Sequence, residues 1–144
     1  MSVSISIDIN ASPPDVAAIM IDVERWHEWT ASISSVQLLT PGPIAVGSRA
    51  RVRQPQLPPS VWMVTALDPA RGFTWVSSGP GFAVTAHHYA APTPSGARAT
   101  LGLDYTGLFG WAIARMTRTI TLRYVQMEAD GLKRRSEAAR QTPK

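Results

Sequence analysis

The feature that most constrains the fold is a long stretch without proline, from Leu108 to about Ala139, which closes the sequence. Its apolar residues and one glycine recur at steps of four and three, as they do on one face of an α-helix. They are Phe109, Ile113, Met116, Ile120, Tyr124, Met127 and Gly131. A helix of this length would extend for about 45 Å, which is enough to cross a whole small domain. Its apolar face needs a partner surface, and the rest of the chain must supply it.

The residues before this helix read mostly as strands. From residue 3 to residue 9, valine or isoleucine alternates with polar residues, which predicts a strand with one buried face. Ser12 followed by Pro13 predicts the start of a short helix, and a second short helix or a loop is expected after it. About six strands, separated by turns with proline or glycine, are predicted between Val36 and Tyr105. Successive hairpins imply an antiparallel sheet, so the predicted class is α+β, with the long helix laid across a curved sheet.

Composition limits the classes of protein that fit. A chain of 144 residues with 44% hydrophobic residues is long enough for one core and too short for two, so residues 1–144 are predicted to form a single domain. Cysteine is absent from the sequence, which excludes disulfides, thiolate metal sites and cysteine nucleophiles. No stretch is apolar enough to span a membrane, and residues 1–10 lack the pattern of a signal peptide. We therefore expect a cytoplasmic protein without membrane insertion.

The formal charge of +4 raises the question of a nucleic-acid partner. Five cations concentrate in the last helical turns and the tail, namely Lys133, Arg134, Arg135, Arg140 and Lys144. Cations at this position suit the negative end of the helix dipole and a solvated terminus. We therefore expect no nucleic-acid partner.

Four segments carry a resemblance to a known superfamily. They are Ala11-Ser12-Pro13-Pro14-Asp15-Val16, Asp22-Val23-Glu24-Arg25-Trp26-His27-Glu28-Trp29, Gly47-Ser48-Arg49 and Glu128-Ala129-Asp130-Gly131-Leu132-Lys133. With the order of the predicted elements, they make the whole chain resemble the START-related polyketide cyclase/dehydrase superfamily, also called SRPBCC or helix-grip. The resemblance implies a seven-stranded antiparallel sheet wrapped around the C-terminal helix, two short helices after the first strand, and a deep, mostly apolar cavity. Members include lipid carriers, plant hormone receptors and polyketide aromatases and cyclases, so the fold alone does not choose a function.

Aromatic residues are the main candidates for lining such a cavity, because they combine a large apolar area with a polar group. The sequence has five tryptophans, and Trp29 is expected near the cavity mouth. Each aromatic side chain could instead belong to the core, because the face on which a strand residue lies depends on register. The predicted ligand-binding residues are Trp29, Trp62, Trp75, His88, Tyr105, Thr117, Thr121 and Tyr124.

Residues that could carry chemistry are few. His87 and His88 are adjacent on a predicted strand, so their side chains point to opposite faces and cannot hold one metal ion together. No metal-ligand spacing is present, and no metal is expected. The catalytic candidates are His88, Tyr105 and Arg118, which could handle protons or polarise a carbonyl group. The sequence has no nucleophile elbow, phosphate loop or dinucleotide fingerprint, so no cofactor is expected.

Three functions from different classes stay open at this point. The preferred one is a monomer or homodimer that binds a small hydrophobic molecule, lipid-like or polyketide-like, between the sheet and the helix. The second is an enzyme, a polyketide-type cyclase, aromatase or dehydratase, and it requires polar groups that face inward together. The third is a partner-binding domain that acts through its surface, which an exposed apolar patch or a filled cavity would favour.

Overall fold

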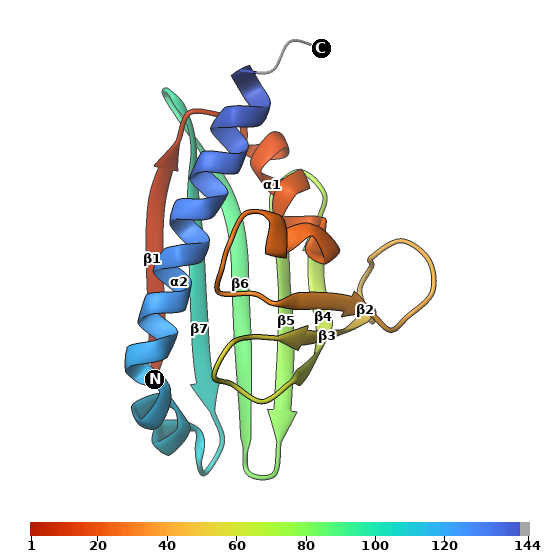
Figure 1. Cartoon of the computed structure of the whole chain (residues 1–144), viewed down its shortest axis with the longest axis vertical. Coiled ribbons are helices and arrows are strands. Elements are labelled where there is room, and N and C mark those ends of the chain that lie inside the picture. The colour runs from red at the N-terminus through yellow and green to blue at the C-terminus, as the bar shows by residue number, and fades with distance from the viewer. Residues whose placement is uncertain (142–144) are drawn as a thin grey trace.

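The chain folds into one antiparallel sheet of seven strands with the helices packed on one face (Figure 1). The computed structural model describes residues 1–141, with side chains as far as residue 139. Lys144 and the side chain of Arg140, which belong to the basic tail noted in the sequence, lie outside the described residues. The predicted α+β class is confirmed, and so is the helix-grip arrangement with two short helices after the first strand.

The sheet is an antiparallel meander, and the first strand forms one of its edges. Its strands are β1 (Ser2–Ile9), β2 (Ser35–Leu38), β3 (Arg49–Arg53), β4 (Ser60–Asp68), β5 (Gly72–Gly79), β6 (Phe82–Thr93) and β7 (Gly96–Thr106). Their order is β1-β7-β6-β5-β4-β3-β2, so each strand from β2 to β6 pairs with the next one in the sequence. β1 pairs with β7, where Val3 lies opposite Leu103 and Ile7 opposite Ala99. The hairpins follow from the turns that glycine and proline mark in the sequence.

Two short helices follow β1 and cover one end of the sheet. α1 (Pro13–Ile21) begins as its sequence predicts, because Ser12 accepts a hydrogen bond from the backbone N–H of Asp15 at 3.3 Å and Pro13 takes the first helical position. η1 (Val23–Glu28) is a 3-10 helix that buries Trp26. Since α1 packs against β5, β6 and β7, the inner face of the sheet is shielded at this end (Figure 1).

α2 (Gly110–Gln141) is the long helix, and it crosses the sheet beside β1 and β7 (Figure 1). The predicted stripe is wrong at two positions in its first half, because Phe109 and Met116 are 54% and 83% exposed. The helix turns small and hydroxyl-bearing side chains toward the sheet there, which a pattern built on large apolar residues does not detect. The buried side chains of this inward face are Ala114, Thr121, Tyr124, Val125, Ala129, Leu132 and Ser136.

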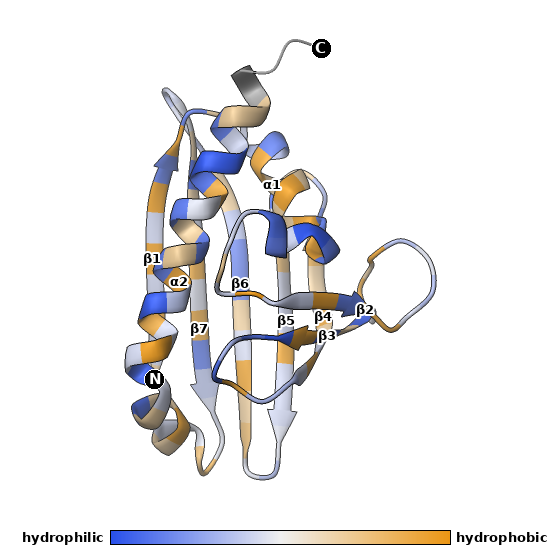
Figure 2. Ribbon diagram, in the orientation of Figure 1, coloured by the Kyte–Doolittle hydropathy of each residue, from blue (hydrophilic) through white to orange (hydrophobic). Residues whose placement is uncertain are grey.

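Hydropathy is mixed along α2 and the strands. Figure 2 shows hydrophilic and hydrophobic residues interleaved along the long helix and across the sheet. Among residues 1–141, no helix is both long enough and apolar enough to pass through a bilayer.

Gly131 lets α2 approach the end of η1 closely. A Cβ atom at this position would lie 2.0 Å from the carbonyl oxygen of Trp29 and 3.2 Å from its indole ring. The first contact is far shorter than nonbonded atoms tolerate, and it involves backbone that cannot rotate away. The glycine therefore sets the distance between α2 and the segment around Trp29.

Replacing Gly131 by Ala is expected to destabilise the fold by about 2 kcal/mol, because overpacking against Trp29 outweighs the gain in helix propensity. Urea unfolding followed by tryptophan fluorescence measures the change. The matched control is Thr119→Ala on the exposed face of the same helix, which is expected to keep or slightly raise the stability. Wild-type stability of Gly131→Ala would contradict the close contact between α2 and Trp29.

Candidate ligand-binding cavity

A cavity of about 480 Å³ lies between the inner face of the sheet and α2. Its walls come from η1, from β3 to β7, from α2 and from the proline-containing loop between β3 and β4. Apolar and aromatic side chains predominate among the lining residues. The volume suits a small organic molecule.

Three tryptophans form one wall of this cavity. The ring centroids of Trp26 and Trp75 are 5.4 Å apart, and those of Trp62 and Trp75 are 5.8 Å apart. The indole N–H of Trp26 donates to the backbone carbonyl of Met20 at 2.9 Å, and that of Trp62 donates to the hydroxyl of Ser60 at 2.8 Å. Because these polar groups are satisfied by the protein, the rings offer the cavity mainly apolar surface.

Hydroxyl groups from β7 and α2 form the opposite side. The phenol of Tyr105 and the hydroxyl of Thr121 lie 3.3 Å apart, within hydrogen-bonding distance. Tyr124 donates a short hydrogen bond from its phenol to the carbonyl of Pro55, which ties α2 to the loop after β3. Thr117 donates to the carbonyl of Ile113, one turn earlier in the helix, at 2.7 Å. These contacts hold the lining side chains in place without filling the cavity.

His88 lies deep in the aromatic wall. It is 6% exposed, and its ring stacks on Phe73 with a centroid distance of 4.5 Å and an interplanar angle of 16°. Burial lowers the pKa of its imidazole to about 3, although a backbone hydrogen bond with Phe73 opposes the shift. The ring is therefore neutral at physiological pH, and its Nδ1 atom has no hydrogen-bond partner among the described residues.

Glu128 supplies the cavity with a carboxyl group that sequence reasoning missed. Its Oε1 atom accepts a hydrogen bond from the hydroxyl of Ser32 at 3.5 Å, and Ser32 is fully buried beside Thr30. Burial raises the pKa of Glu128 to about 7, and the Ser32 hydrogen bond only partly offsets this shift. Helical spacing could have predicted this position, because Glu128 lies one turn after Tyr124 and two turns after Thr121 on the same face of α2.

The structure places six further candidates on the cavity wall and two outside it. Trp62, Trp75, Tyr105, Thr117, Thr121 and Tyr124 line the cavity together with His88. Trp29 does not line it, because the ring packs between Trp26, at a centroid distance of 5.8 Å, and Gly131. Trp26, which the sequence did not single out, takes the wall position instead. Arg118 lies on the exposed face of α2, so a catalytic role for it inside the cavity is not supported.

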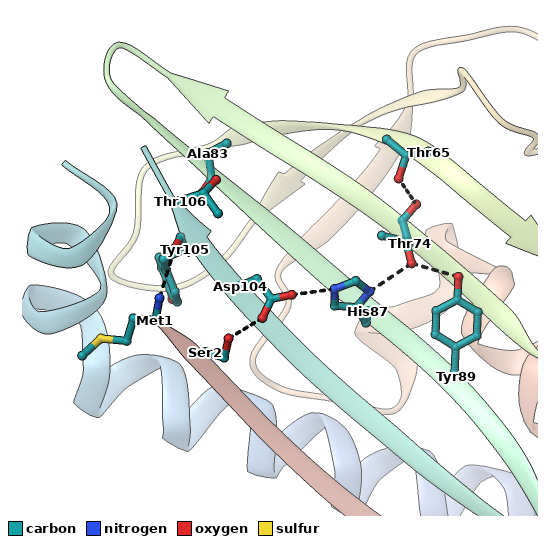
Figure 3. A network of polar contacts seen from close by, with 10 residues as sticks. All are labelled: Met1, Ser2, Thr65, Thr74, Ala83, His87, Tyr89, Asp104, Tyr105 and Thr106. Carbon is teal, nitrogen blue, oxygen red and sulfur yellow. Dashed lines mark hydrogen bonds and ion pairs between the residues drawn. The ribbon is translucent and has the colours of Figure 1, made fainter. Parts of the chain in front are cut away.

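The opposite face of the sheet carries a separate polar network. Asp104 and His87 are 2.9 Å apart, and the other ring nitrogen of His87 lies 3.2 Å from the hydroxyl of Thr74 (Figure 3). Thr74 in turn lies 2.8 Å from the phenol oxygen of Tyr89. The expectation that His87 and His88 point to opposite faces is confirmed, since His88 contacts Trp26 on the inner face. Within the described part of the chain, no three metal-ligating side chains gather in one place.

The chain belongs to the family described as "polyketide cyclase / dehydrase and lipid transport", which matches residues 1–137. The superfamily that the sequence resembles is thereby confirmed. None of the curated proteins matches the chain. Family membership supports the binding of a hydrophobic molecule or a cyclase role.

Solved structures share the fold at low sequence identity. TTHA0849 from Thermus thermophilus is 20% identical, with a TM-score of 0.75 over 96% of this chain and 99% of that one. The Zhui aromatase/cyclase from Streptomyces sp. R1128 is 14% identical, with a TM-score of 0.76 over 95% and 93%. Ginseng major latex-like protein 151 from Panax ginseng is 12% identical, with a TM-score of 0.75 over 94% and 97%. At these identities the likeness concerns the fold.

Proposed function

We propose that the protein binds a small hydrophobic molecule, lipid-like or polyketide-like, in the cavity between the sheet and α2. The observation that carries this proposal is the cavity of about 480 Å³, walled mainly by apolar and aromatic side chains. Burying an apolar molecule of this size removes its surface from water, which is the main driving force for such binding. Family membership agrees with this role.

Three aromatic residues give the cavity its binding surface in this proposal. Trp62, Trp75 and Tyr124 present ring surface from the sheet and from the helix, on opposite sides of the bound molecule. The indole N–H of Trp62 and the phenol of Tyr124 are already paired within the protein, so neither needs water to satisfy it. A preformed wall of this kind reduces the entropy cost of binding.

Filling the cavity is expected to weaken binding strongly without unfolding the protein. Val84 is half-buried on the cavity wall, and Val84→Phe adds a ring to the space where the ligand would lie. We expect its affinity for N-phenyl-1-naphthylamine, a neutral apolar fluorophore, to fall about tenfold or more. Energy transfer from the cavity tryptophans to the bound fluorophore measures the affinity.

The control for this variant is its neighbour in the same strand. Thr85 points to the opposite face of the sheet from Val84, so Thr85→Phe adds the same ring away from the cavity. It is expected to bind the fluorophore as the wild type does. If the two variants bind equally well, the fluorophore does not occupy the cavity and the proposal is wrong.

The enzyme alternative is favoured by one observation. Three polar groups, the Nδ1 atom of His88, the phenol of Tyr105 and the carboxyl of Glu128, belong to side chains that line the same cavity. A carboxyl group that titrates near neutral pH is suited to general acid–base chemistry on a carbonyl substrate. Turnover of a poly-β-ketone analogue, followed by the rise of aromatic absorbance, would support this role if Glu128→Gln abolished it.

The surface alternative also has one observation in its favour. Four apolar side chains at the start of α2 are more than half exposed, namely Leu108, Phe109, Trp111 and Met116. The cavity itself is not filled by the protein's own aromatic side chains. Binding in the cavity is therefore the function that the geometry supports best.

A further inference from the structure

We propose that the cavity selects apolar molecules that carry a cationic amine, that Glu128 holds the ammonium group, and that carboxylic acids are excluded. This inference deepens the proposed function and rests on it, because it names the chemical class of the ligand. It follows from three features of the wall: its charges, its aromatic rings and the unmet bonding capacity of one carboxyl group.

The charges on the cavity wall favour a cation. Glu128 contributes a carboxyl group, and no lysine or arginine occurs among the described lining residues. Arg118 is exposed, and Arg49, Arg51 and Arg53 of β3 lie outside the lining as well. A ligand with a carboxylate would lose its hydration without gaining a cationic partner, and it would be repelled by Glu128.

The aromatic rings favour the same class of ligand. Trp26, Trp62, Trp75 and Tyr124 line the cavity, and Tyr124 precedes Glu128 by one helical turn. The faces of such rings carry negative partial charge and attract ammonium groups, and this attraction increases when water is excluded. The apolar body of an amine can therefore lie against the tryptophans, while its charged end lies beside Tyr124 and Glu128.

The ionised carboxylate of Glu128 would have few hydrogen-bond donors around it. Ser32 gives it one long hydrogen bond of 3.5 Å, and Ser32 also lies 2.7 Å from the hydroxyl of Thr30. A carboxylate can accept about four hydrogen bonds, so most of its capacity is unused by the described residues. An ammonium group offers three donors and the opposite charge, which matches what the site lacks.

Among the described residues, no other charged group on the surrounding elements pairs with Glu128. His87 on β6 pairs with Asp104 on the opposite face of the sheet. His88 on β6 is neutral, Tyr105 on β7 is paired with Thr121, and the neighbouring loops contribute the uncharged Thr30, Ser32 and Gln54. Among the described cations that follow on α2, Arg134 is exposed, and Lys133 and Arg135 have partners elsewhere. Lys133 bonds Glu137 and the carbonyl of Asp8, and Arg135 bonds Glu28 of η1 at 2.7 Å.

Proton linkage gives the proposal a distinctive signature. The raised pKa of Glu128, about 7, means that the carboxyl group of the empty cavity is mostly protonated at pH 5.5 and mostly ionised at pH 8. A cationic ligand binds the ionised form better, so its affinity increases with pH. A neutral ligand of the same shape gains nothing from the ionisation.

Three naphthalene derivatives with the same apolar body test the proposal. They are 2-(2-naphthyl)ethylamine, 2-(2-naphthyl)ethanol and 2-naphthylacetic acid, titrated by calorimetry at pH 5.5 and pH 8. At pH 8 we expect the amine to bind about tenfold more tightly than the alcohol, and the acid to bind most weakly. The amine should lose about this factor at pH 5.5, whereas the affinity of the alcohol should not increase with pH.

Glu128→Gln is the decisive variant, because it keeps the shape of the side chain and removes its charge. It should still bind the alcohol, and it should bind the amine no better than the alcohol. Asp130→Asn, two residues along the same helix and exposed, is the matched control and should keep the preference for the amine.

The possible failures are distinguishable. Equal binding of amine and alcohol by the wild type, tightest binding of the acid, or an amine preference that survives in Glu128→Gln would overturn the selectivity while leaving apolar binding intact. Failure of all three compounds to bind would overturn the proposed function together with this inference.

Discussion

Replacing His88 by Phe is expected to make the protein more resistant to acid than the wild type. The folded-state pKa of His88 is about 3, below the ordinary value of 6.5, because burial disfavours the imidazolium. As the pH falls below 6.5, His88 therefore binds a proton in the unfolded chain but stays neutral in the folded chain. The contribution of neutral His88 to the stability of the wild type is complete above pH 6.5 and is lost progressively as the pH falls toward 3.

This linkage predicts the size of the effect. Phenylalanine preserves the stack on Phe73, so the two proteins should differ by about 1 kcal/mol or less at pH 7. At pH 4 the variant should be more stable relative to the wild type by about 3 kcal/mol, and the difference reaches about 4 kcal/mol at pH 3. Urea unfolding at each pH, followed by tryptophan fluorescence, measures it.

Thr121→Val provides the control, since it alters another buried polar group of the cavity wall that carries no titrating proton. Its difference from the wild type is expected to be the same at pH 7 and pH 4. If His88→Phe also kept a constant difference, His88 would have to be accessible to water in the folded protein, which would contradict its position in the aromatic wall.

Replacing Glu128 by Gln is expected to stabilise the protein at neutral and higher pH. The folded-state pKa of about 7 lies above the ordinary value of 4.5, because burial disfavours the carboxylate. The contribution of the protonated carboxyl group is complete below pH 4.5 and is lost as the pH rises through 7. Relative to Glu128→Gln, the wild type should lose about 3 kcal/mol of stability between these limits.

The two groups have opposite pH dependence where their titration ranges overlap. Between pH 4.5 and pH 6.5, Glu128 favours the folded state at lower pH and His88 favours it at higher pH. Their effects partly cancel in the wild type, so each single variant reveals the other group. His88→Phe should become less stable as the pH rises through this range, and Glu128→Gln should become more stable. A double variant that kept either slope would contradict this assignment.

Much of the fold could be predicted because the sequence is locally consistent. The alternation in β1, the helix cap at Ser12 and the proline and glycine turns each depend on a few neighbouring residues. The inward face of α2 could not be predicted in the same way. Its first half carries Ala114, Thr117 and Thr121, and helical spacing of large apolar residues selects a different face, with Met116.

The residues of the candidate site also differ in whether the local sequence predicts their position. Trp62, Trp75 and Tyr105 are strand residues, and their placement on the wall follows from a two-residue period once the register is known. Arg118 was misplaced because it follows Thr117 by one residue, which rotates its side chain by about 100° around the helix and out of the cavity. Glu128 could have been found from its helical spacing after Thr121 and Tyr124, whereas Trp26 reaches the wall through tertiary packing of η1, which no local pattern reports.

The most direct test of cavity binding is to locate a bound molecule by intermolecular nuclear Overhauser effects between 2-(2-naphthyl)ethanol and the methyl groups of the protein. We expect contacts with Val84, Leu103 and Ile113, which line the cavity. Contacts confined to Leu108 and Met116, on the exposed surface at the start of α2, would contradict binding between the sheet and the helix.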